Sequence, residues 1–193
     1  MSDTKQVLRK CGLSRLPDEQ VVTLDILSHD DAKGAIRAVF DAYDFKGPDQ
    51  ATWVDKLASL SQGWPQHINR VSVAAGRVIH RNGGGIQPNL LQSAIAMGQE
   101  RKNDYYASRL EACSEDPWIY KQLAEAAGER NGLLSWDEID SISERMRNKM
   151  GLSTNDFLAD ALHAGVLMDS KSLPDHYKIP IPSFGDYLRE LPL

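Results

Sequence analysis

The stretch GWPQHINRVSVAAGRVIH, residues 63–80, carries the clearest fold signal in the chain. Gly63 can stop one helix, and Pro65 suits the first turn of the next, where its missing N–H costs nothing. Asn82 and the three glycines after it end the pattern. The stretch therefore predicts a tight turn followed by a helix. Its apolar positions are Ile68, Val71, Val73, Ala75, Val78 and Ile79.

Two more helices are predicted before this turn. Ser28 can cap a helix whose first turn holds Asp30 and Asp31, because carboxylates are favoured at the positive end of the helix dipole. Gly47-Pro48 ends that helix. A second helix is expected from Asp49 to Gln62, immediately before Gly63.

After the turn, Pro88 reopens a helical pattern that becomes polar from Gln99 to Asp116. The apolar pattern changes at Asp116-Pro117, where we place a domain boundary. We therefore predict a helical bundle over residues 1–115, with a short strand remnant at its N-terminus, and a second domain over residues 116–193.

Three helices are predicted in the second domain. The first ends at Gly128. Ser135 caps the second, and Glu138 three residues later completes a capping box, in which side chain and backbone bond reciprocally. Ser153 or Thr154 caps the third, which runs to Ala164.

A β-hairpin is expected after these helices. Val166–Met168 predicts one strand and His176–Pro182 the other, which its prolines should push to the edge of the sheet. Ser183 is expected to cap a last short helix. Three helices and a hairpin are the order of a winged-helix domain, so the predicted class is mainly α.

Composition and motifs restrict the possible functions. The net charge of -5 argues against a general nucleic-acid coat. No apolar run is long enough to span a membrane and no signal peptide is evident, so cytoplasmic residence is expected. The sequence contains no G-x-S-x-G, no H-E-x-x-H and no clustered His or Cys. We therefore predict no catalytic residues, no metal site and no cofactor.

Two pairs of stretches together are similar to one family. These are residues 24–32 with residues 63–65, and residues 165–167 with residues 177–184. They resemble the C-terminal part of AAA+ ATPases of the STAND and origin-recognition-like type, in which a helical lid and a winged helix follow the nucleotide-binding core. The resemblance covers residues 12–190.

The resemblance implies specific roles for a few residues. In that family a Gly-x-Pro turn opens the lid helix over the nucleotide, which here is Gly63-Trp64-Pro65. Arg70 on the following helix could reach phosphate, and Arg15 could act similarly, although either could be an ordinary surface arginine. The sequence has no G-x-x-x-x-G-K-[ST] phosphate loop. The chain thus resembles a lid and winged helix without their ATPase core, so we expect a regulatory module whose partner is that core or another protein.

DNA binding is the alternative function. The third helix of a winged helix can enter the major groove. Here that helix carries Asp156 and Asp160 and no basic residue, which suits phosphate poorly. Basic residues are present before and after this helix in the sequence. They could form a positively charged stripe that contacts DNA, or they could simply be a solvated surface. These residues are Arg145, Arg147, Lys149, Lys171 and Lys178.

Protein contacts have their own candidates. Aromatic side chains dominate interaction hot spots, and the chain could offer Tyr105, Tyr106, Trp118 and Tyr120, unless these form the core. If the first twenty residues belong to a missing core, they would expose an apolar face. The chain would then form a homo-oligomer that buries Val21, Val22 and Leu24.

Overall fold

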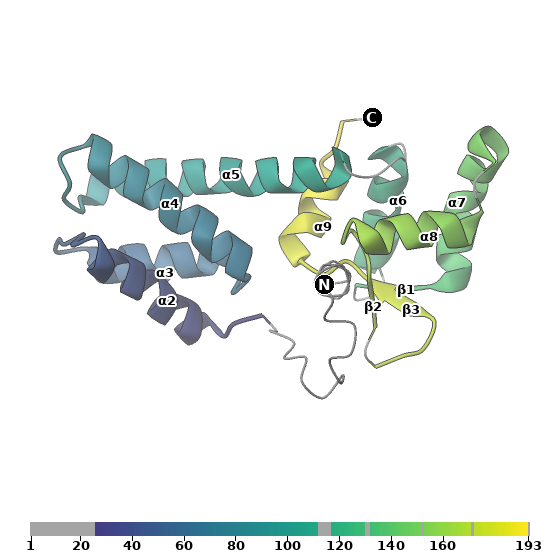
Figure 1. The fold of residues 1–193 in the computed structure, drawn as a ribbon, viewed down its shortest axis with the longest axis horizontal. Coiled ribbons are helices and arrows are strands. Elements are labelled where there is room, and N and C mark those ends of the chain that lie inside the picture. Colours follow the sequence, from purple (N-terminus) through teal and green to yellow (C-terminus); the bar gives the residue numbers. More distant parts are fainter. Residues whose placement is uncertain (1–25, 112–116, 130–131, 152, 171, 193) are drawn as a thin grey trace, which may run out of the picture. The chain divides into compact units, whose positions relative to one another are not determined.

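The computed structural model describes residues 26–111, 117–129, 132–151, 153–170 and 172–192 (Figure 1). These ranges contain eight α-helices and one three-stranded antiparallel sheet, which confirms the predicted mainly α class. Their contacts divide them into a first unit, residues 26–105, and a second unit, residues 106–192. The predicted boundary at Asp116 lies outside the described residues.

The helices of the first unit begin close to the predicted residues, but the first of them ends at Ala42, before the predicted stop at Gly47. Ser28 accepts a hydrogen bond from the Asp31 backbone N–H at 3.1 Å, so its predicted capping role is confirmed. Pro65 is the first residue of its helix, as predicted. The elements are α2 (His29–Ala42), α3 (Gln50–Ser61), α4 (Pro65–Arg81), a 3-10 turn (Pro88–Leu90) and α5 (Leu91–Glu111), which continues into the second unit.

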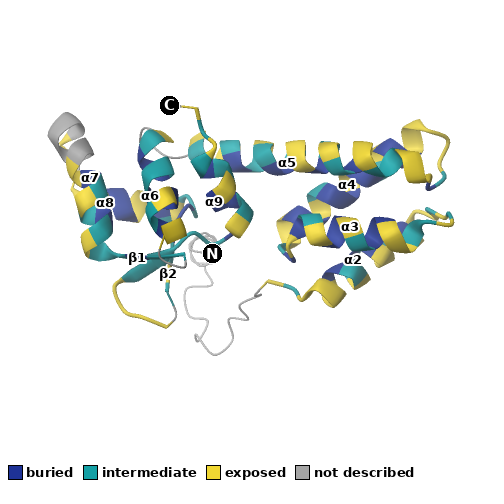
Figure 2. Ribbon diagram, turned by 180° about the vertical axis from the view of Figure 1, so that it is seen from behind, coloured by how far each residue is buried: buried dark blue, intermediate teal, exposed yellow. Residues whose placement is uncertain are grey.

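The core of the first unit lies among α2, α3 and α4, whose buried faces are dark blue in Figure 2. Trp53 is its largest side chain and has no exposed surface. Its ring meets the Phe40 ring edge-on, with centroids 6.5 Å apart. The helical spacing of the apolar residues places them on this one face. Other members are Ala32, Ile36, Leu57, Val71, Ala75 and Ile79.

Capping also determines where the helices of the second unit begin. The Ser135 backbone N–H donates to Glu138 at 2.9 Å, and the Glu138 N–H donates back to Ser135 Oγ at 3.3 Å, which confirms the predicted capping box. Ser153 and Asp156 form a second box at α8. The helices are α6 (Pro117–Glu129), α7 (Trp136–Met150), α8 (Thr154–His163) and α9 (Pro182–Arg189), and the strands are β1 (Leu133–Ser135), β2 (Met168–Asp169) and β3 (His176–Lys178).

The prediction that the second hairpin strand lies at a sheet edge was wrong. The strand order is β1-β3-β2, so β3 is central, with Leu134 opposite Tyr177 and Met168 opposite Lys178. The prolines do not interfere because β3 ends at Lys178, before the first of them. Each central residue can therefore use its backbone groups for pairing.

Two local predictions near this sheet were wrong in part or in full. Of the predicted strand Val166–Met168 only Met168 is in β2, because the N–H groups of Val166 and Leu167 donate back to the Ala161 carbonyl at 2.9 and 3.1 Å. Ser183 does not cap α9, whose N-cap position is Ile181. Its hydroxyl instead shares a hydrogen bond of 2.6 Å with the hydroxyl of Tyr106.

The aromatic residues that were predicted as candidates for protein contacts differ in how deeply they are buried. Tyr106 and Tyr120 have no exposed surface and belong to the core of the second unit. The Tyr106 ring stacks on Phe184 with centroids 4.9 Å apart. Tyr105 and Trp118 are only partly buried.

Candidate functional site

The turn between α3 and α4 requires a glycine at position 63. Gly63 has a φ of +71°, and its carbonyl accepts a hydrogen bond of 2.9 Å from the Leu27 N–H. A Cβ atom added there would lie 2.1 Å from the Leu27 carbonyl oxygen. Both the backbone angle and the close approach therefore exclude a side chain. The predicted turn at residues 63–65 is confirmed, whereas its role near a nucleotide stays a prediction.

Two buried basic side chains satisfy the end of α3. Lys102, on α5, is 2% exposed and donates its Nζ proton to the Leu60 carbonyl at 2.8 Å. His67, on α4, has no exposed surface, and its Nδ1 lies 3.2 Å from the Ser61 carbonyl, to which it donates. The last carbonyls of a helix lack intrahelical partners, and cations are favoured there. The turn is thus tied to α4 and α5.

Arg70 is held against α5. Its guanidinium carbon lies 4.8 Å from the centre of the Tyr105 ring, a cation–π arrangement. Its Nη1 donates to the Arg101 carbonyl at 3.3 Å, and its Nε is buried without a partner among the described residues. The guanidinium therefore has a packing role in this structure. Arg15, the other arginine predicted to approach phosphate, lies outside the described residues.

An apolar groove runs between α2 and α4 on the surface of the first unit. It has a volume of about 770 Å³. Two of its apolar side chains are unusually open, with Tyr43 70% and Val73 39% exposed. The lining comprises Ala35, Val39, Tyr43, Phe45, Pro65, Ile68, Asn69, Ser72, Val73, Gly76, Arg77 and His80. We call this the α2–α4 groove.

One wall of the groove is aromatic. Tyr43 stacks on Phe45 with ring centroids 5.8 Å apart and planes 18° from parallel. Phe45 packs against α4 at Gly76, where a Cβ atom would lie 3.3 Å from the Phe45 ring. The wall is therefore pre-formed in the free chain. Nearby, the Ser72 hydroxyl is buried without a hydrogen-bond partner among the described residues.

Sequence reasoning did not find this groove. Val73 entered the prediction only as an apolar position of a helix. One signal was available. Val73 is two residues from each of the core residues Val71 and Ala75. Residues two apart do not lie on the same face of an α-helix, so Val73 cannot share the buried face of its two neighbours.

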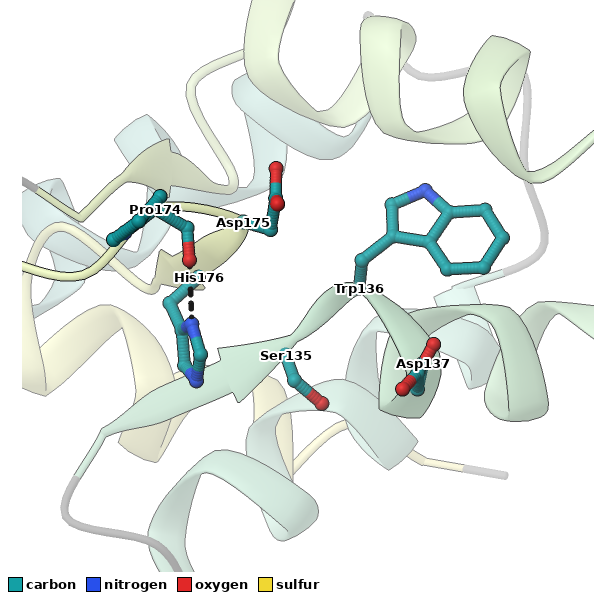
Figure 3. Close-up of a pocket in the computed structure, with 6 residues that line it drawn as sticks. All are labelled: Ser135, Trp136, Asp137, Pro174, Asp175 and His176. Carbon is teal, nitrogen blue, oxygen red and sulfur yellow. Dashed lines mark hydrogen bonds between the residues drawn. The ribbon is translucent and has the colours of Figure 1, made fainter.

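A second, more polar pocket lies between the start of α7 and the β2–β3 connection (Figure 3). It has a volume of about 550 Å³. The His176 Nδ1–H donates to the Pro174 carbonyl at 2.8 Å, and the Trp136 backbone N–H donates to the Asp175 carbonyl at 3.0 Å. The first bond is local to the connection, and the second holds the connection against α7. The lining residues are Ser135, Trp136, Asp137, Pro174, Asp175 and His176.

Most of the predicted basic stripe lies outside the described part of the chain, so the stripe stays a prediction. Lys178 lies on β3 and is partly buried. Arg145, Arg147 and Lys149 lie on α7, but their side chains are outside the described part of the chain, as is Lys171. On α8, Asp156 is used by the capping box.

Two further features are absent from the described residues. No group of three or more His, Cys, Asp or Glu side chains in those ranges could hold a metal ion. None of the helices described is long and apolar enough to cross a membrane.

No family model, curated protein or solved structure matches this chain.

The contact of Lys102 with α3 generates a prediction. Lys102→Met keeps much of the side-chain length but leaves the Leu60 carbonyl without its buried donor, so the free energy of unfolding should fall by roughly 1–3 kcal/mol. Urea denaturation followed by circular dichroism measures the change. Lys56→Met, at an exposed position on α3, is the control and should change stability little. Equal stability of the two variants would show that Lys102 does not support the turn.

Proposed function

We propose that the chain is a non-catalytic interaction module that binds a protein partner through the α2–α4 groove. The observation that carries this proposal is the exposure of Tyr43 and Val73 in a largely apolar lining. Exposed apolar area of this kind costs free energy in water and recovers it when a partner covers it. The groove lies between two helices, which is a geometry that accepts a helical segment.

The resemblance to AAA+ and STAND ATPases gives the proposal its context. We place the chain as a lid and winged helix that works with a separate ATPase core or another protein. The second unit supports this placement by its element order α6-β1-α7-α8-β2-β3 and its strand order β1-β3-β2. Three helices followed by a hairpin suit a winged helix, in which β1 adds a third strand.

DNA binding is the second candidate function, and the same element order favours it. The argument against DNA binding is the charge of α8, the helix that would enter the major groove of DNA. This helix carries Asp156 and Asp160 and no Lys or Arg. Carboxylates facing phosphates are repulsive, so protein binding is the better-supported proposal.

The groove proposal predicts a pair of contrasting variants. Val73→Glu places a charge in the apolar lining, whereas Ala96→Glu makes a similar change at an exposed position on α5 outside it. Proteins that copurify with the full chain from its source cells should be lost with Val73→Glu and retained with Ala96→Glu. Quantitative mass spectrometry measures both, after circular dichroism shows that each variant is folded. Retention of every partner by Val73→Glu would exclude the groove as the binding surface.

The DNA alternative is tested by titrating the full chain with duplex DNA at low and at physiological salt. We expect no binding tighter than about 10⁻⁵ M at physiological salt, because α8 presents carboxylates. Tighter binding that is abolished by changing Arg145, Arg147 and Lys149 together to Gln would instead support the DNA function. A triple variant of lysines on the first unit, Lys33, Lys46 and Lys56, controls for the loss of charge.

A further inference from the structure

We infer that the occupant of the α2–α4 groove is an amphipathic helix with an acidic flank. This inference rests on the proposed function and names the chemistry of its partner. It depends on three properties of the groove, which are its length, its charge and the position of its aromatic wall.

The length of the groove suits a helix. Its lining follows α4 from Pro65 to His80. At 1.5 Å per residue this is about 22 Å, or four helical turns. The lining residues Ala35 and Val39 on α2 and Tyr43 at its C-cap are each four apart and so form one row. Two such rows accept the apolar stripe of a third helix, with anchors at intervals of three and four residues.

The charge of the groove favours an acidic partner. Arg77 and His80 line it, and no carboxylate does. Arg77 is exposed and has no ion pair among the described residues. Lys33 and Lys46, by contrast, are paired with Asp30 and Asp44. A positively lined groove in a chain of net charge -5 is thus a local feature that a carboxylate would complement.

The helix dipole does not account for Arg77. Basic side chains are favoured in the last turn of a helix, and α4 has His80 and Arg81 there. Arg77 lies one turn earlier, on the groove side. The position of Arg77 is therefore better explained by an interaction with a partner than by the dipole of α4.

The aromatic wall fixes where the acidic group should lie. Phe45 packs at Gly76, directly before Arg77 in the sequence, and Tyr43 stacks on Phe45. A partner side chain that packs on this wall would bring its neighbours close to Arg77. The expected pattern is an apolar or aromatic anchor with Asp or Glu three or four residues away on the flank of the same helix.

Selection from a displayed library tests this inference without a known partner. The library consists of random helical peptides of about 14 residues, enough to span the groove. The full wild-type chain is the target, and binders that also bind Val73→Glu are removed. Recovered peptides are sequenced and measured by fluorescence anisotropy against wild type, Arg77→Gln and Arg81→Gln. Arg81 is exposed and does not line the groove, so its variant controls for lost charge.

We expect the binders to be amphipathic with an excess of Asp and Glu. Arg77→Gln should weaken them by roughly three- to fivefold, the effect of an exposed ion pair, and added salt should reduce the difference. Arg81→Gln should change affinity little. Groove-dependent binders with no acidic excess, or with a basic one, would overturn the inference and leave the proposed function standing.

The absence of any groove-dependent binder would overturn the groove as a docking site, and with it the proposed function. Light scattering shows whether the groove is instead occupied by a second copy of this chain. If the wild-type chain dimerises and Val73→Glu is monomeric, the occupant is a second copy of this chain, and the inference of an acidic partner helix is wrong.

Discussion

The first unit depends on how the C-terminus of α3 is satisfied. The carbonyls of Leu60 and Ser61 would be costly if buried without donors. Lys102 from α5 and His67 from α4 supply these donors from two other helices. Gly63 lets the chain turn sharply between α3 and α4. This arrangement fixes α3, α4 and α5 to one another, and it explains why a lysine and a histidine lie in an otherwise apolar interior.

The same arrangement produces the groove. Since α4 is anchored to α3 and α5 by one side, its remaining face is left beside α2, where Gly76 allows Phe45 to approach closely. Tyr43 and Val73 stay open because the unit has no further element to cover them among the described residues. The packing that stabilises the unit therefore also leaves an apolar surface rigid and available. Such pre-organisation favours binding, because little conformational entropy is lost when a partner arrives.

Local signals predicted much of the fold, and interactions distant in sequence account for what they missed. Ser28 and Ser135 marked helix starts because capping acts within three residues. The central position of β3 could not be predicted, because it depends on pairing with β1 some forty residues earlier. Ser183 looked like a cap but serves Tyr106. The groove also escaped prediction, since hydrophobicity alone does not say whether Val73 is covered by another helix.

If the chain acts through the α2–α4 groove, Arg70 and the turn at Gly63 are parts of its scaffold and form no nucleotide site. Calorimetric titration of the full chain with ATP and magnesium distinguishes the two roles. We expect no saturable heat, because the Arg70 guanidinium already packs on Tyr105 and bonds to the Arg101 carbonyl. Saturable binding that is abolished by Arg70→Ala, in a variant that stays folded, would contradict this expectation and show that the turn is a nucleotide site.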